Sequence, residues 1–516
     1  MKRLSVKHFN ILFHTHTVSG IAISAVLFIM FFAGAIALYK QEVYQWEDPE
    51  ARIKKSTQLD YERMMHRLAS VSNGGMEIHE LRVILPTDAK PIYTFYLTGE
   101  SEAYETYTYN PLTDSLLDLK DGEGATVGET LYRLHFLDQL PWYIGRYIAG
   151  FVALFFSFAV VTGLLIHWQN IRSKFFAFSF RDLRKQFWTN AHTVFGILGL
   201  PFQLMYAITG AFYMLSLFIL APAVFVLFGG DQGKLVTMIY PPEAFHAHGE
   251  DARPATNIPV QQLLDAVRAD YPDATVSYLE IVNPGHDNAV MSMDLIDPQR
   301  FNSDGLIIAD LNTGNYKLTL SPGEKNYQQS LLQGISKLHF ATFGGWPLKL
   351  FYFLLSMISC FVIISGVMMW KQARNKPSYT EGQRRFHHRI TMAYLAVCFS
   401  LLPATALLFN AEHWVPKGAD HVDRVNAIFF GSWFMLSVVC YFMKNERDIF
   451  IRCLVLMGIF ALLVPISNGW RTGDWGWEIG DAYPYVSIVD GCWLLVGIIA
   501  VFCAGYSQKQ RATNLS

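Results

Sequence analysis

Eight long apolar stretches constrain this chain more than any other feature. Each approaches or exceeds the ~20 apolar residues that a helix needs to cross the hydrocarbon core of a bilayer. The chain has 516 residues, of which 52% are hydrophobic, which argues against a soluble single-domain protein. We expect membrane-spanning helices at residues 18–39, 144–167, 193–215, 350–370, 391–410, 427–443, 450–467 and 486–506.

Two long polar inserts separate the first four of these helices. In each insert, an amphipathic helical pattern is followed by alternating stretches that are typical of antiparallel strands. We therefore predict a membrane all-α bundle of about eight helices with two small α+β inserts. The predicted parts are the first helix at 1–39, the first insert at 40–141, the second and third helices with a basic loop at 142–215, the second insert at 216–345, the fourth helix at 346–375, and a C-terminal four-helix membrane extension at 376–516.

The loops between the apolar stretches differ in charge, and this predicts the orientation of the chain. Lysine and arginine are concentrated near the N-terminus, in loops 168–190, 371–389 and 444–452, and in the C-terminal tail. The alternate short loops, 411–426 and 468–485, are richer in acidic residues. By the positive-inside rule, we expect both termini in the cytoplasm and both inserts on the outer side. The formal net charge of −2 indicates no nucleic-acid partner.

The cysteines and the late histidines give weaker signals. All six cysteines fall inside or at the ends of apolar stretches, and none is part of a Cys-x-x-Cys pair. This pattern argues against a disulfide framework in the inserts and against thiolate-held zinc or iron–sulfur clusters. Among the last four helices, the outer loops contain His413 and His421 beside acidic residues. Loose metal capture is one interpretation, but we expect these to be solvated loop residues.

A histidine with two glycines at fixed spacing occurs twice. In each copy, the first glycine follows the histidine by 4 residues and the second glycine by 18. Eighteen residues make five turns of an α-helix, so the three residues share one helix face. A histidine beside side-chain-free backbone suits ligation of the iron of a planar macrocycle, whereas helix packing through glycine would explain a single copy equally well. The copies are His16, Gly20 and Gly34, and His192, Gly196 and Gly210.

A second motif also occurs twice, around the second and fourth helices. His135 and His339 each follow a leucine. A basic residue comes 11 residues after the first histidine and 10 after the second, and a glycine comes 17 residues after each basic residue. The basic residues are Arg146 and Lys349. The first two helices therefore resemble the third and fourth in order and orientation. We predict that the first four helices are a duplicated two-helix unit, related by an axis along the membrane normal.

The four repeated histidines sort by depth into two pairs. His16 and His192 begin their helices at the cytoplasmic side, whereas His135 and His339 precede theirs at the outer side. Two neutral imidazoles on opposite faces of one haem iron give six-coordinate iron that is suited to electron transfer. We therefore predict two b-type haems, one near each membrane surface. Covalent c-type attachment is excluded because Cys-x-x-Cys-His does not occur in the sequence.

Further candidates lie close to these sites. Arg146 and Lys349 lie just inside the outer surface, where they would pair with haem propionates or extend to lipid headgroups. His167 ends the second helix near the cytoplasmic level, where it would replace one of the two ligands or hydrogen-bond the inner haem. His14 points some 200° away from His16 on an ideal helix, so both cannot ligate one iron. The repeated glycine spacing favours His16 over His14.

Together with the αβ inserts, these motifs resemble the PepSY-associated transmembrane family, which includes bacterial inner-membrane siderophore-iron reductases. The resemblance covers about residues 1–375. It implies di-haem electron transfer from the cytoplasm to the periplasm, PepSY-like periplasmic inserts, and release of iron from ferric siderophores or other Fe(III) chelates as Fe(II). Shorter members lack residues 390–506, so the resemblance does not identify the electron donor. Carried over by position, it implies the haem ligands His16, His135, His192 and His339.

We consider three functions for this sequence. A ferric-siderophore reductase needs only an electron at an accessible outer haem, because one-electron reduction weakens the binding of iron to hard oxygen donors. The sequence has no GxGxxG motif that opens a helix after a strand and no inner soluble domain for a flavin or NADPH, so a quinol or a donor protein must supply the electrons. A non-enzymatic, membrane-anchored regulator that binds periplasmic proteins would leave the histidine repeat unexplained. A transporter is disfavoured because intramembrane acids are almost absent.

Overall fold

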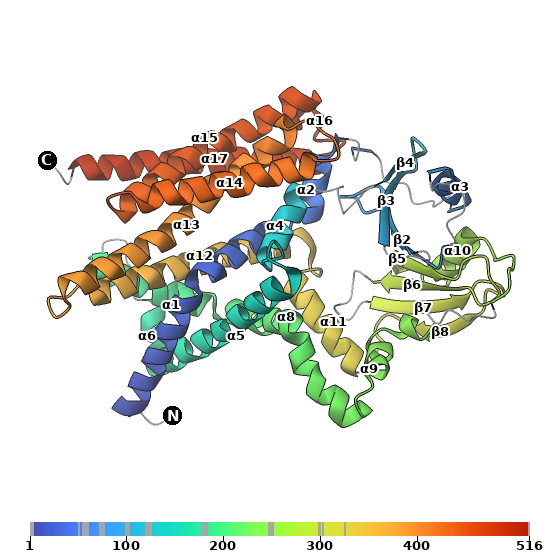
Figure 1. Ribbon diagram of the computed structural model, residues 1–516, viewed down its shortest axis with the longest axis horizontal. Helices are drawn as coiled ribbons and strands as arrows, with labels where there is room; N and C mark the ends of the chain where they lie inside the picture. The colour runs from blue at the N-terminus through green and yellow to red at the C-terminus, as the bar shows by residue number, and fades with distance from the viewer. Residues whose placement is uncertain are drawn as a thin grey trace. The chain divides into compact units, whose positions relative to one another are not determined.

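The chain forms two compact units, shown in Figure 1. The helical unit comprises residues 1–47, 126–216 and 344–516, and the sheet-containing unit comprises residues 48–125 and 217–343. The computed structural model describes residues 5–49, 52–53, 61–71, 78–98, 104–118, 126–176, 178, 184–245, 252–297, 301, 304–324 and 327–513.

The helical unit contains most of the apolar sequence. Its first group of elements is α1 (Val6–Ala37), α2 (Lys40–Glu47), α4 (Val127–His135), α5 (Trp142–His167), η3 (Trp168–Asn170), α6 (Ile171–Phe175), α7 (Arg184–Leu198), the first part of α8 (Leu200–Phe228) and α12 (Gly345–Arg374). Its C-terminal group is α13 (Glu381–Trp414), α14 (His421–Tyr441), α15 (Glu446–Thr472), α16 (Gly476–Ile479) and α17 (Pro484–Thr513).

Eight helices among the described residues are long and apolar enough to cross a membrane. They are α1, α5 with its continuation to Phe175, α8, α12, α13, α14, α15 and α17. Each overlaps one of the predicted stretches, so the prediction of eight helices long and apolar enough to span a membrane is confirmed for the described residues.

One predicted span is divided in the structure. The stretch at 193–215 is shared between α7 and α8, with the break at Gly199. Pro201 follows in the first turn of α8, where its missing N–H group needs no helical partner. Because proline also restricts the residue before it, the chain begins a new helix here rather than continuing the old one.

Polar side chains fix several helix starts. The side chains of Ser5 and Asn445 accept hydrogen bonds from backbone N–H groups in the first turns of α1 and α15. Thr380 forms a capping box with Gln383 at the start of α13. Each cap satisfies amide groups that the first turn of a helix leaves unpaired, so these starts are defined locally by the sequence.

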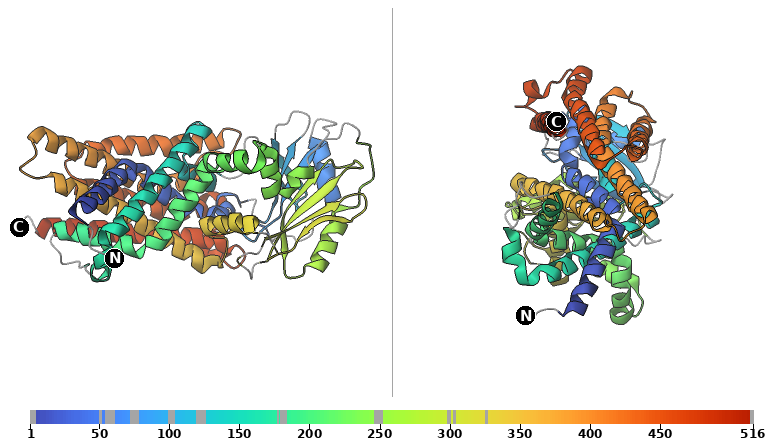
Figure 2. Two further views of the ribbon diagram at one scale, coloured as in Figure 1. Left: turned by 90° about the horizontal axis from the view of Figure 1, so that it is seen from below. Right: turned by 90° about the vertical axis from the view of Figure 1, so that its left-hand side faces the viewer.

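The spanning helices pack in two neighbouring groups. In the first group, α1 packs against α5 and α12, and α12 packs against α7. In the C-terminal group, α13 packs against α14 and α15, and α15 packs against α17, so that these helices run alongside one another in Figures 1 and 2. The short helix α2 contacts both α4 and α17. It therefore connects the first group to the C-terminal extension.

The sheet-containing unit is built from both polar inserts. From the first insert come α3 (Tyr61–Val71), β1 (Glu80–Ile84), β2 (Tyr93–Thr98), β3 (Tyr104–Asn110) and β4 (Ser115–Asp118). From the second come α9 (Gln232–Ile239), η4 (Pro241–Phe245), α10 (Val260–Asp270), β5 (Thr275–Val282), β6 (Val290–Ile296), β7 (Asp304–Asp310), β8 (Tyr316–Leu320) and α11 (Tyr327–Phe340).

The eight strands form one antiparallel sheet rather than two small ones. Its strand order is β4-β3-β2-β1-β5-β6-β7-β8, so the first insert supplies one half and the second insert the other. The halves join where β1 pairs with β5, with Leu81 opposite Ile281 and Val83 opposite Leu279. Two separate sheets would each expose an unpaired edge strand at this position. Joining them pairs both edges, which is the physical reason for the difference from the prediction.

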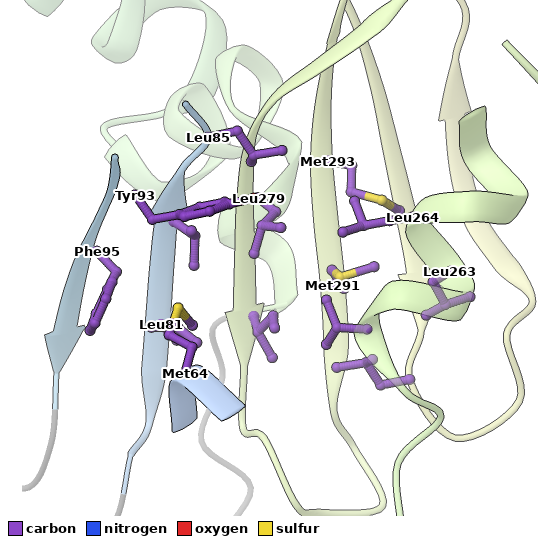
Figure 3. Packing of buried hydrophobic residues seen from close by; sticks show 14 of the residues in the cluster. Met64, Leu81, Leu85, Tyr93, Phe95, Leu263, Leu264, Leu279, Met291 and Met293 are labelled. Atoms are coloured by element: carbon purple, nitrogen blue, oxygen red, sulfur yellow. The ribbon is translucent and has the colours of Figure 1, made fainter. Parts of the chain in front are cut away.

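Helices α3 and α10 contribute to a single core on one face of this sheet. Strand residues that alternate along the chain point to the same face. Leu81, Leu279 and Met291 are fully buried there, together with Met64 of α3 and Leu264 of α10 (Figure 3). The core of the unit therefore spans the junction between the two inserts, and neither insert completes it alone.

Candidate functional site

Two of the predicted iron ligands meet inside the helical unit. His16 lies about three turns into α1, and His192 lies in α7. Their ring centroids are 6.0 Å apart, and the ring planes are inclined at 67°. Both side chains are half-buried. The structure thus brings together one imidazole from each of the two His-Gly motifs.

A backbone carbonyl orients each of these imidazoles. Nδ1 of His16 lies 2.8 Å from the carbonyl oxygen of Ala159, and Nδ1 of His192 lies 2.9 Å from that of Val362. A carbonyl oxygen only accepts, so Nδ1 is the protonated nitrogen in both rings. The lone pair of Nε2 therefore remains available for a metal. Ligating histidines in proteins characteristically show this arrangement.

Glycines on the neighbouring helices make room for the two rings. A Cβ atom at Gly163 would lie 3.0 Å from Cε1 of His16, and a Cβ at Gly366 would lie 3.1 Å from Cε1 of His192. In each case, the carbonyl that accepts the hydrogen bond belongs to the residue four positions before this glycine. The local geometry around the two histidines is therefore the same on α5 and on α12.

The spacing of the two rings fits one metal ion between them. Two metal–imidazole bonds of about 2.0 Å, with each ring centre ~1.1 Å behind its Nε2, place the centroids of two axial imidazoles ~6 Å apart. The centroid distance here is 6.0 Å. A Cβ at Gly20 would meet no atom within 4 Å, and one at Gly196 would meet only Val362, at 4.0 Å. These residues therefore fit a planar metal macrocycle held by His16 and His192.

His135 is held in the same way at the end of α4. Its Nδ1 lies 2.7 Å from the carbonyl oxygen of Met30, and its ring lies against Gly34 of α1, where a Cβ would come within 2.5 Å of Nδ1. Burial lowers the pKa of His135, although the hydrogen bond to Met30 opposes the shift. The imidazole is therefore neutral, as metal ligation requires. Gly34 was expected to line a macrocycle; instead it accommodates the imidazole of a neighbouring helix.

His339 lies near the end of α11, in the sheet-containing unit. Its ring is 5.2 Å from that of Phe340, and Lys337, two residues earlier, forms a 3.0 Å ion pair with Asp304. Because His135 belongs to the helical unit, the pairing of His135 with His339 stays a prediction.

The two alternative ligands occupy different surroundings. His167, the last residue of α5, is half-buried and interacts electrostatically with both His16 and His192. It therefore lies near the candidate metal site. His14 is exposed and stacks edge-on with its neighbour Phe13, so the structure does not bring it to this site.

The two basic candidates have acidic partners that the sequence interpretation missed. Nε of Arg146 donates to Asp138 at 2.9 Å, and the guanidinium lies 5.1 Å from the ring centre of Phe136. Lys349 pairs with Glu42, a buried residue of α2. No periodicity or spacing pointed to either acid, because each pair joins elements that are brought together only by folding.

The late histidines are not the solvated loop residues that were expected. His413 and His421 are 6% and 5% exposed, and Nε2 of His421 lies 3.1 Å from Oε1 of the buried Glu412. The ring centre of His413 lies 4.4 Å from that of Trp46 in α2, whereas His421 contacts Glu412 and Lys417. Among the described residues, no group of three or more His, Cys, Asp or Glu side chains is arranged to hold a metal ion directly.

The comparison with known families agrees with the motifs. Residues 13–373, which are more than half of the chain, match the family described as the PepSY-associated TM region. The match begins in α1, includes both polar inserts and ends in α12, before the C-terminal extension. No curated protein matches the chain. The resemblance inferred from the motifs is thereby confirmed: the chain belongs to the family of the PepSY-associated TM region.

Proposed function

We propose that this membrane protein binds two b-type haems and transfers electrons across the bacterial inner membrane to Fe(III) chelates, such as ferric siderophores, in the periplasm. The observation that carries the proposal is the His16–His192 pair. Two imidazoles with carbonyl-oriented Nδ1 atoms stand at the separation that one iron requires.

In this proposal, the chain's own backbone orients the ligands of the cofactor. Bound between His16 and His192, haem would supply a six-coordinate iron that exchanges single electrons. The chain fixes the tautomers of both rings through Ala159 and Val362 and makes room for them with glycines.

We propose a second haem at the level of His135, with His339 as the opposite ligand. His135 shares the hydrogen-bonded tautomer and the glycine contact seen at the first site. The positive-inside distribution of Lys and Arg supports a periplasmic position for this level, where Fe(III) chelates would be accessible. The family match over the duplicated motifs supports a common architecture for the two levels.

The proposed reaction is one-electron reduction of chelated Fe(III). Fe(III) prefers hard oxygen donors, and Fe(II) binds to them less tightly, so the transferred electron releases the metal. The electrons come from a quinol or a donor protein, since the sequence contains no dinucleotide-binding motif. A membrane-anchored, haem-free regulator remains the alternative, but it gives the ligand geometry of His16 and His192 no role.

Haem stoichiometry and spectra test the proposal. The purified chain should contain two haems with sharp reduced-minus-oxidised bands. His16→Ala and His192→Ala should each remove one haem, and His135→Ala and His339→Ala should each remove the other. His14→Ala is the matched control, because His14 is exposed on the same helix as His16. A haem-free wild-type protein, or unchanged haem in both His16→Ala and His192→Ala, would reject the assignment.

The substrate is tested separately in reconstituted vesicles. Chemically reduced protein should be reoxidised on adding a ferric siderophore, with one Fe(II) trapped by a ferrous chelator for each electron lost. Reoxidation should fail in His135→Ala if the periplasmic-side haem delivers the electron. If haem-loaded protein is not reoxidised by any ferric chelate, iron is rejected as the electron acceptor. The proposal that the protein transfers electrons would then still stand.

A further inference from the structure

Helix α2 brings acidic residues into the C-terminal group of helices. Trp46 and Glu47, at the end of α2, are 0% and 1% exposed. The indole Nε1 of Trp46 donates to Oδ1 of Asp490 in α17 at 2.7 Å. Nδ2 of Asn468 donates to the other oxygen of the same carboxylate at 3.0 Å. This anchor fixes the place of Glu47 beside α13.

Glu47 has one satisfied and one unsatisfied oxygen. Its Oε2 accepts hydrogen bonds from the N–H groups of Val127 at 2.8 Å and Gly128 at 3.3 Å, at the start of α4. Its Oε1 is buried and has no hydrogen-bond partner among the described residues. A buried carboxylate oxygen without a partner is costly, and a proton on it would remove much of that cost.

Glu412 has the complementary arrangement. It is 1% exposed, and its Oε1 contacts Nζ of Lys417 and lies 3.1 Å from Nε2 of His421. Its Oε2 is likewise buried without a hydrogen-bond partner among the described residues. The carboxyl groups of Glu47 and Glu412 interact electrostatically. One proton on Glu47 would remove the repulsion between the two buried carboxylates and the cost of the unpaired oxygen of Glu47.

We propose that Glu47 and Glu412 share one proton, and that this buried site binds its proton more tightly when the haem at the level of His135 is reduced. The second part rests on the proposed function. The link is α4, which begins at the N–H groups that bind Glu47 and ends at His135. The eight residues between these ends span about 12 Å. At that distance in a low-dielectric site, charges still interact.

The coupled step is a simple proton uptake. Were haem bound at His135 and reduced by one electron near or above the pKa of Glu47, the ionised carboxylate of Glu47 would take up one proton from bulk water to form an O–H bond. Net charge inside the protein is unchanged by the combined event. Lys417, whose side chain is 59% exposed, and His421 connect the carboxylate of Glu412 with solvent. The C-terminal helices thereby acquire a role in electron transfer at the level of His135.

The charges around Glu47 define the pH range of this coupling. Burial and the neighbouring Glu412 raise the pKa of Glu47 to about 8, against the two backbone hydrogen bonds and Lys417. Asp490 lies on α17, and Glu129 lies in the first turn of α4, where it pairs with Lys40 and Arg133. Despite burial, these ion pairs hold the pKa of Glu129 below its ordinary value. Glu129 therefore stays ionised while Glu47 titrates.

The test is redox titration of the full chain at a series of pH values from about 6 to about 10. The component assigned to His135 is identified by its loss in His135→Ala. Its midpoint potential should be constant at low pH and should fall as pH rises through the pKa of Glu47. Glu47→Gln should abolish this fall, since the neutral amide mimics the protonated acid and its oxygen still accepts from the N–H groups of α4.

Two further variants separate the proposal from a general charge effect. Glu129→Gln removes a charge from the same helix and should shift the potential equally at every pH, leaving the fall intact. Glu412→Gln leaves the contact with α4 untouched; because it removes the like charge that raises the pKa of Glu47, the fall should move to lower pH. If the midpoint potential of Glu47→Gln depends on pH as that of the wild type does, the redox link is overturned.

Infrared spectroscopy tests whether the Glu47–Glu412 pair holds a proton, and this test does not need haem. Difference spectra recorded between low and high pH on the full chain should contain a carboxylic acid C=O band that is absent in Glu47→Gln and shifted in Glu412→Gln. Absence of the band in the wild type, or its persistence in Glu47→Gln, would overturn the shared proton. A haem-free preparation would reject the proposed function together with the redox link, while this band would still decide the proton site.

Discussion

Gly34 provides a sharp test of how His135 is positioned. A Cβ atom at this position would lie 2.5 Å from Nδ1 and 2.7 Å from Cε1 of the imidazole. Because favourable contacts between such atoms lie near 3.5 Å, the ring must move by about 1 Å in Gly34→Ala. The same movement disrupts the 2.7 Å hydrogen bond from Nδ1 to the carbonyl of Met30. One methyl group therefore removes both the position and the orientation of the ring.

The displacement is large compared with what metal ligation tolerates. Bond lengths at a metal site vary by about 0.2 Å, so an imidazole displaced by about 1 Å no longer reaches the metal. The lost hydrogen bond and the overpacking each cost about 1–3 kcal/mol. Native proteins are stable by about 5–15 kcal/mol, so we expect Gly34→Ala to fold and to retain one haem.

Haem content per chain and the reduced-minus-oxidised spectrum measure the effect. Gly34→Ala should bind one haem instead of two and should keep the spectrum of the His16–His192 site. Gly163→Ala and Gly366→Ala introduce milder contacts, of 3.0 Å and 3.1 Å to Cε1 of their histidines. These variants should shift the bands of the other haem without losing it. The closest Cβ contact, in Gly34→Ala, should therefore cause loss of a haem, and the longer contacts, in Gly163→Ala and Gly366→Ala, should cause only a shift of the bands.

Two alanine variants complete the test. Gly431→Ala in α14 is the matched control, since a Cβ there meets no atom within 4 Å and lies far from the histidines in the chain. Gly20→Ala also meets no protein atom within 4 Å, so any change in its haem spectrum must come from contact with the macrocycle itself. Two intact haems with an unchanged spectrum in Gly34→Ala would refute the positioning argument.

Three other predictions follow from packing and charge. Between about pH 4.5 and about pH 8, folded Glu47 holds a proton that the unfolded chain has released. Thermal stability should therefore fall as pH rises through this range, and this dependence on pH should weaken in Glu47→Gln. The same slope of stability against pH in both proteins would contradict the assigned protonation. Lys349→Met should leave the buried Glu42 carboxylate unpaired and destabilise the protein by about 3–5 kcal/mol, and Glu42→Gln in the same chain should restore most of the loss, as measured by thermal unfolding. Val83→Asp should place an unpaired charge in the core at the β1–β5 junction and make the sheet-containing unit protease-sensitive, whereas a similar change at the exposed Ile84 should not.

The sequence predicted those parts of the site that depend on helical periodicity. The 18-residue spacing indicated which helix face His16 and His192 share with their glycines, and their common depth predicted that they pair; the structure places their rings 6.0 Å apart. The partner of Gly34 was not predictable in this way. Periodicity gives the face on which a glycine lies, but not the residue of another helix that fills the space, which here is His135.

Contacts between distant segments account for the remaining differences. His413 and His421 follow an apolar stretch and precede another, a pattern typical of a solvated loop. In the structure both are buried, and His413 lies against Trp46 of α2, which is far away in the sequence. Likewise, the pairing of β1 with β5 depends on two edge strands that are separated by two predicted spans. Single-sequence patterns carry no information about such partners.

The shared sheet has a consequence for how the chain is made. Strand β1 is synthesised long before β5, and α5, α7 and α8 lie between them in the chain. Until β5 emerges, the inner edge of β1 has no partner, and the apolar face of the first four strands lacks the side chains of α10. Biogenesis therefore includes an interval in which a half-finished sheet must be shielded from other chains while later helices enter the bilayer. Closure of the sheet can therefore occur only after α5, α7 and α8 have been synthesised.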